Sequence, residues 1–155
     1  MFCRRPLGSV FLLAAAAGYF MVATGHSVFA ATILVTEAEA NFPPPKEIPP
    51  PSDRGITRGP KIEFEEDKVA HRAPLHLKLR FKTFGGSAID LGAVKATYIR
   101  DPKVDLTSRI KPFAQQSGID IPDAQLPPGE HLIQINIKDS DGRAASKIIK
   151  LRITP

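Results

Sequence analysis

The chain has 155 residues, 43% of them hydrophobic, and a formal net charge of +5 at pH 7, which predicts one domain of ordinary size with enough aliphatic side chains for one core. It has no Trp and only two Tyr, so it offers little of the aromatic surface on which nucleic-acid bases or sugar rings stack. Basic residues interleave with acidic ones and form no block, which argues against a nucleic-acid-binding protein.

Residues 1–30 are typical of a secretory signal peptide. Arg4-Arg5 gives a positive start, residues 7–22 form an apolar run, and Val28-Phe29-Ala30 has the small residues of a cleavage site. We expect cleavage after this site, which leaves a net charge of +3. The alternative is an uncleaved membrane anchor, because the apolar run is only slightly shorter than the ~20 residues that a spanning helix needs.

Residues 31–59 are assigned to a proline-rich, extended linker. Within it, residues 32–36 are β-prone but short, and we expect a frayed terminus; the alternative is a strand added to the edge of the following domain or of a neighbour's domain. Residues 41–60 hold seven of the fifteen prolines. Each proline fixes φ and lacks an amide donor, which favours a stiff polyproline II spacer. The alternative, a ligand for a proline-reading domain, fits less well, because such domains are mainly intracellular and the chain is predicted to be exported.

Residues 60–155 are assigned to the folded domain, because apolar and polar side chains alternate there with the period of half-buried strands. The clearest strand covers residues 75–82, and shorter ones are expected at residues 61–65 and 94–98. The apolar faces of these three strands are Ile62, Phe64, Leu75, Leu77, Leu79, Phe81, Val94, Ala96 and Tyr98.

Residues 100–116 are the least regular part of the domain. Ile110 and Phe113 have helical spacing, so a single helical turn under the sheet edge fits as well as a short strand. Residues 119–122 are expected to form a short edge strand that Pro122 keeps from lengthening.

Two long strands close the chain as a hairpin. Ile133, Ile135 and Ile137 alternate with polar residues, Asp139-Ser140-Asp141-Gly142 supplies turn chemistry, and residues 149–153 alternate again. The hairpin predicts an antiparallel pair with one buried face.

The residues before this hairpin carry a resemblance. Leu126-x-Pro128-Gly129-x-His131, followed by alternating aliphatics, an Asp/Gly turn and a final aliphatic strand, resembles the last two strands of bacterial immunoglobulin-like and fibronectin type III-like domains. His131 stands where such domains carry the Tyr of a tyrosine corner. The resemblance implies an all-β fold, an immunoglobulin-like Greek-key β-sandwich of about seven strands.

No metal or cofactor site is predicted. His26 leaves with the signal, and His71, His76 and His131 lack the alternating partner that a strand-borne site offers, so we interpret them as surface or corner histidines. Cys3 is the only cysteine and lies in the signal, so we expect no disulfide and no cysteine nucleophile in the mature chain.

No catalytic residues are predicted either. The best calcium candidate is Asp139-x-Asp141-Gly142, but Lys138 and Arg143 flank it, and such turns commonly close hairpins. The acidic residues 63–67 are interpreted as a solvated strand end. Ser87 follows two glycines but lacks the strand-turn-helix context of a nucleophile.

The sequence therefore predicts an exported, non-enzymatic binding or structural module of the cell envelope, periplasmic or secreted, that engages another protein. Membrane contact is expected only through an uncleaved signal. The surfaces to test are residues 100–116, the Gly85-Gly86 loop, and the outward face of His76, Lys78, Arg80 and Lys82. The alternatives are a periplasmic metal-binding or carrier protein and a small envelope enzyme.

Overall fold

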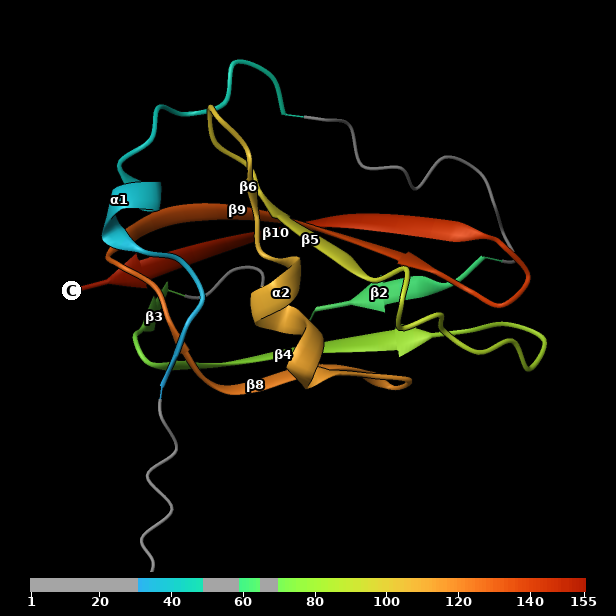
Figure 1. The fold of residues 1–155 in the computed structure, drawn as a ribbon. Coiled ribbons are helices and arrows are strands. Elements are labelled where there is room, and N and C mark those ends of the chain that lie inside the picture. Colours follow the sequence, from blue (N-terminus) through green and yellow to red (C-terminus); the bar gives the residue numbers. More distant parts are fainter. Residues whose placement is uncertain (1–30, 49–58, 65–69) are drawn as a thin grey trace, which may run out of the picture.

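A computed structural model describes residues 31–48, 59–64 and 70–155 of the chain. Two five-stranded sheets pack face to face in the manner of a β-sandwich (Figure 1). One sheet has the order β1 (Thr32–Ile33), β8 (Gly118–Gln125), β4 (Leu75–Lys82) and β2 (Lys61–Glu63), with β7 (Ala114–Gln115) also paired to β8. The other has the order β3 (Ala70–Arg72), β10 (Ala144–Thr154), β9 (Gly129–Lys138), β5 (Lys95–Tyr98) and β6 (Val104–Asp105). Both sheets are mixed, because β1 pairs parallel with β8 and β3 parallel with β10.

The expected closing hairpin is confirmed as β9 and β10. Ile133 lies opposite Ile149 and His131 opposite Leu151 in an antiparallel register. Paired residues share one face of a sheet, so these apolar side chains point together into the interior. The expected strand at β4 is confirmed as well, with strictly alternating burial along its eight residues.

The core lies between the two sheets. Leu77 from β4, Ile135 from β9 and Leu151 from β10 are each 1% exposed or less and belong to one cluster of buried residues. The strands expected at residues 61–65 and 94–98 supply Ile62 and Tyr98 to the same cluster. The described residues form ten strands and not about seven, because four of the ten, β1, β3, β6 and β7, are short additions of two or three residues to the strands that the alternation predicts.

The expectation of a short edge strand at residues 119–122 is wrong. β8 is eight residues long and pairs with β4 on one side and with β1 and β7 on the other. Leu77 pairs with Ile121 and Leu75 with Ala124, so β8 carries one extra residue at Pro122. A proline has no amide to donate to the neighbouring strand. Because Pro122 lies at this irregularity, its missing donor does not end the strand.

The expectation of a frayed terminus at residues 32–36 is also wrong. β1 pairs with the end of β8, and the amide of Leu34 donates to the carbonyl of Gln125 at 2.9 Å. Leu34 and Val35 are 0% and 2% exposed. Their burial places residues 32–40, including α1 (Glu37–Ala40), with the sheets and not in a linker. Of the alternatives considered, strand addition to this chain's own domain is the one observed.

Both alternatives left open for residues 100–116 occur there, since the segment holds a helical turn and the short strands β6 and β7. α2 (Thr107–Ile110) continues into a 3-10 turn, η1 (Lys111–Phe113), with Ile110 in the core. Figure 1 shows α2 in front of the two sheets, on the side of the sandwich that faces the viewer. The predicted signal, residues 49–58 of the linker and residues 65–69 lie outside the described residues. No helix within the described ranges is long and apolar enough to cross a membrane.

Candidate functional site

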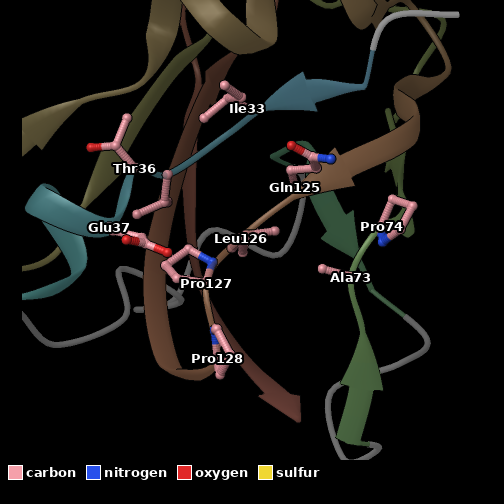
Figure 2. A pocket seen from close by; sticks show the side chains of 10 residues that line it. Ile33, Thr36, Glu37, Ala73, Pro74, Gln125, Leu126, Pro127 and Pro128 are labelled. Carbon is pink, nitrogen blue, oxygen red and sulfur yellow. The ribbon is translucent and has the colours of Figure 1, made fainter. Parts of the chain in front are cut away.

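A pocket of about 420 Å³ lies at the end of the sandwich where β1 meets the connection between β8 and β9 (Figure 2). Three segments far apart in the sequence line it: the β1–α1 segment, the residues before β4, and the β8–β9 turn. Its lining residues are Ile33, Val35, Thr36, Glu37, Ala73, Pro74, Gln125, Leu126, Pro127 and Pro128. The lining is mainly aliphatic and proline, with Glu37 as its one charged member.

Local sequence explains how β1 and α1 form one wall of this end pocket. Successive strand residues point to opposite sides, so Ile33 is 54% exposed while Leu34 is fully buried. Thr36 then caps α1: its hydroxyl accepts from the amide of Glu39, and the Glu39 carboxylate accepts from the amide of Thr36. This reciprocal capping ends the strand and starts the helix at the rim of the pocket.

An ion pair fastens the same segment to α2. Both terminal nitrogens of Arg109 donate to the carboxylate of Glu39 at 2.8 Å, and one of them also donates to the carbonyl of Leu34 at 2.9 Å. The hydrogen bonds from Arg109 lower the pKa of Glu39 from 4.5 to about 2, against the opposing effect of burial. The same contact raises the pKa of Arg109. We call this contact the Glu39–Arg109 clasp.

His131 is buried next to the β8–β9 turn and forms hydrogen bonds with Pro127 of that turn and with Tyr98 of β5. Its Nε2 donates to the carbonyl of Pro127 at 2.8 Å, so the neutral ring accepts at Nδ1, where the hydroxyl of Tyr98 donates at 2.9 Å. His131 is 1% exposed. Burial lowers its pKa, and the charge of Arg100 adds to that effect. The ring is therefore neutral at pH 7 and spans the same turn that lines the pocket.

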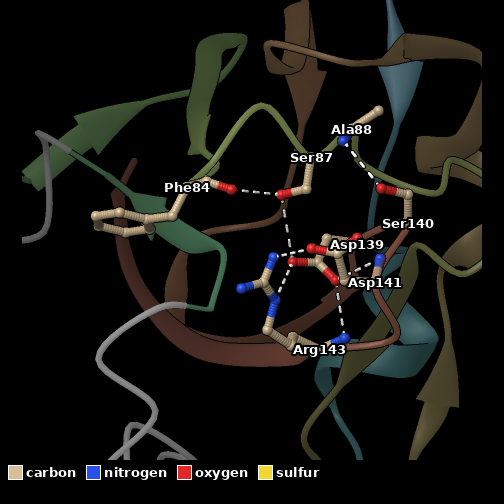
Figure 3. Close-up of polar contacts among 7 residues, drawn as sticks. All are labelled: Phe84, Ser87, Ala88, Asp139, Ser140, Asp141 and Arg143. Carbon is tan, nitrogen blue, oxygen red and sulfur yellow. Dashed lines mark hydrogen bonds and ion pairs between the residues drawn. The ribbon is translucent and has the colours of Figure 1, made fainter.

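The calcium candidate is an ordered turn held by arginine (Figure 3). The buried carboxylate of Asp139 accepts from the amides of Asp141 and Arg143 at 3.1 and 2.8 Å and from Nε of Arg143 at 2.9 Å. Arg143 also pairs with Asp141. Burial would raise the pKa of Asp139, but the hydrogen bonds from Arg143 hold it below its usual value. These donors occupy the oxygens that a cation would need, so the turn is a structural one.

Ser87 lies in the β4–β5 loop and contacts this turn. Its hydroxyl donates to the carbonyl of Phe84 at 2.9 Å and lies 3.4 Å from a carboxylate oxygen of Asp139. Ser140 lies alongside and accepts from the amide of Ala88. The serine therefore links the β4–β5 loop to the hairpin turn, and in the part of the chain that the structure describes no imidazole contacts it.

The predicted surface histidines lie apart from one another. His71 is on β3, whereas His76 is on the outward face of β4 and contacts the carboxylate of Asp120. No group of three or more metal-ligating side chains occurs among the described residues. The rest of the outward β4 face is of mixed charge, with Lys78 beside Asp120 and Lys82 2.7 Å from Glu63.

Neither the end pocket nor the clasp could be recognised from the residues of one segment alone. The spacing of Thr36 and Glu39 is a capping box, and this signal could have located the start of α1. Nothing in the local sequence links Arg109 to either residue, because 70 positions separate it from Glu39.

Comparison of the chain with protein-family models, curated proteins and solved structures found no match. Any function must therefore be inferred from the fold and the surface chemistry of the chain itself.

Proposed function

We propose that the protein is an exported, non-enzymatic binding module of the cell envelope, with an immunoglobulin-like Greek-key sandwich that engages another protein. The strand order supports the immunoglobulin-like part of this proposal. β2, β4 and β8 lie in one sheet and β3, β10, β9 and β5 in the other, so the chain crosses between the layers from β2 to β3, from β3 to β4, from β4 to β5 and from β8 to β9. The side-chain-to-backbone bond of His131 at the start of β9 is the counterpart of a tyrosine corner.

The N-terminal sequence supports export to the periplasm or beyond. Residues 1–30 combine a positive start, an apolar run and a small-residue cleavage site, as signal peptides do. Cleavage after Ala30 would leave β1 and the Glu39–Arg109 clasp in the mature chain.

The exposed edge at β1 carries the binding part of the proposal. Ile33 is 54% exposed on an edge strand and lines the end pocket, where seven of the ten lining residues are proline or aliphatic. Exposed strand edges pair with extended segments of other proteins, and an adjacent apolar pocket gives such pairing its side-chain specificity. This arrangement fits a protein ligand better than a metal ion or a reacting substrate.

The test is a pull-down from envelope extracts of the source organism with the full chain and two variants. Ile33→Asp places a charge at the pocket rim, and Ile48→Asp is the matched control, since Ile48 is 58% exposed and does not line the pocket. Both side chains are exposed, so both variants should fold. We expect the wild type and Ile48→Asp to capture the same partner and Ile33→Asp to lose it. Equal capture by all three would refute a binding site at this edge.

A further inference from the structure

Arg100 is held in a fixed orientation and has no carboxylate partner among the described residues. Its Nε donates to the hydroxyl of Tyr98 at 2.9 Å, and its Nη2 donates to the carbonyl of Glu130 at 2.9 Å. The guanidinium also lies over the Tyr98 ring, 5.4 Å from the centroid. Tyr98 is in turn fixed by His131, so three interactions set the position of one cation.

Part of this guanidinium remains unused. Nε and Nη2 lie on one edge of the group, and the two bonds above use that edge. Nη1 has no hydrogen-bond partner, and Arg100 has no ion pair, among the described residues. The end-on edge, formed by Nη1 and the second hydrogen of Nη2, therefore keeps the fork that matches a carboxylate.

Arg100 lines a second pocket, of about 270 Å³. We call it the arginine pocket; its lining residues are Glu37, Ala40, Asn41, Arg100, Pro127, Pro128, Gly129 and His131. It shares Glu37, Pro127 and Pro128 with the end pocket, so the two lie next to each other. Glu37 lines both and has no ion pair among the described residues, although it shares a pocket with Arg100.

We propose that the arginine pocket binds a carboxylate of an extended peptide segment from the protein partner, with Arg100 as the binding residue. A preoriented guanidinium loses little side-chain entropy on binding, which favours a specific contact over a loose surface ion pair. A singly charged carboxylate suits the pocket better than a phosphate, because Glu37 repels the larger negative charge more strongly. The adjacent end pocket has room for the neighbouring residue of the segment, and Glu37 favours a basic or neutral side chain there.

This proposal rests on the proposed function and names the chemistry of its ligand. The test uses two probe peptides, acetyl-Ala-Ala-Glu-Ala-Ala-amide and its Gln counterpart, titrated into the full chain and followed by amide shifts in NMR spectra. Arg100→Lys keeps the charge but loses the fork, and Lys138→Gln is a control that changes charge at the far end of β9. Glu37→Gln removes the neighbouring negative charge.

We expect the Glu peptide to shift the amides of the arginine pocket and the Gln peptide to bind at least about tenfold more weakly. Arg100→Lys should weaken the Glu peptide by a similar factor, Lys138→Gln should leave it unchanged, and Glu37→Gln should strengthen it. Equal binding of the two peptides, no shift at millimolar Glu peptide, or indifference to Arg100→Lys in a folded variant would each overturn the proposal. If the peptide test fails in one of these ways, a pull-down in which Ile33→Asp does not capture the partner would still support the proposed function. Equal capture by the wild type, Ile33→Asp and Ile48→Asp would refute the proposed function independently.

Discussion

The Glu39–Arg109 clasp predicts an acid-sensitive attachment of the N-terminal segment. The pKa of Glu39 is lowered from 4.5 to about 2, which corresponds to at most about 3.4 kcal/mol of stability from the ionised carboxylate. The side chains of Arg109 and Glu39 are 30% and 15% exposed, so solvent screening reduces this contribution. We therefore expect Glu39→Gln to lower the free energy of unfolding by about 1–2 kcal/mol at pH 7.

The sign of the pH dependence follows from the lowered pKa. Above about pH 4.5 the carboxylate is ionised in both the folded and the unfolded chain, and the stabilisation is complete. As the pH falls toward about 2, the unfolded chain takes up the proton first, and the stabilisation is lost. The difference between the wild type and Glu39→Gln should therefore shrink on acidification.

Urea unfolding at a series of pH values measures this difference, and hydrogen exchange at the Leu34 amide, which is bonded to Gln125, reports the segment directly. Glu47→Gln is the matched control, because it removes the same charge from an exposed position outside the clasp. The reasoning is refuted if Glu39→Gln costs no more than Glu47→Gln at pH 7, or if its cost stays constant on acidification.

Three further predictions follow from close contacts. Burial lowers the pKa of His131, so its imidazole takes up a proton at higher pH in the unfolded chain than in the folded one. The free energy of unfolding should therefore fall as the pH drops below 6.5. In urea unfolding, His131→Phe should flatten this pH dependence and lower the free energy of unfolding by about 1–3 kcal/mol at pH 7. Gly118 has a φ of +153° and a Cβ there would lie 1.9 Å from the carbonyl oxygen of Leu79, so Gly118→Ala should cost more than about 2 kcal/mol in the same assay. Gly85 is the control, because a Cβ there meets nothing within 4 Å, and Gly85→Ala should cost only about 1 kcal/mol for its positive φ. Equal costs for Gly85→Ala and Gly118→Ala would contradict the close contact between residue 118 and Leu79. Asp139→Asn should lower the melting temperature, because Arg143 loses one of its two carboxylate partners. Ca²⁺ should not raise the melting temperature of the wild type, and a rise would support a calcium site at this turn.

Single residues show why some of these features could be predicted and others not. Burial along β4 follows from the alternation of Leu75, Leu77 and Leu79 with charged residues, because a strand places neighbours on opposite faces wherever it lies. Pro122 misled the prediction, since its effect depends on whether the partner strand tolerates an extra residue. That information belongs to β4 and is absent from the local sequence.

The candidate site depended still more on contacts between distant residues. Ile33 and Gln125 are paired across the edge of one sheet, and Arg100 reaches His131 through the hydroxyl of Tyr98. Each residue looks ordinary in its own segment, because an exposed isoleucine or a loop arginine has no local signature.

The amino-acid order alone determined the strands β2, β4, β5, β9 and β10, which face of each is apolar and where the last hairpin turns, because these depend on periodicity and on turn chemistry within a few residues. Tertiary structure decided that β1 joins β8, that the clasp holds α1, and that two pockets meet beside Pro127 and Pro128. Those features arise from pairing and burial between segments up to about a hundred residues apart, and the energy of such contacts exists only once the chain has folded.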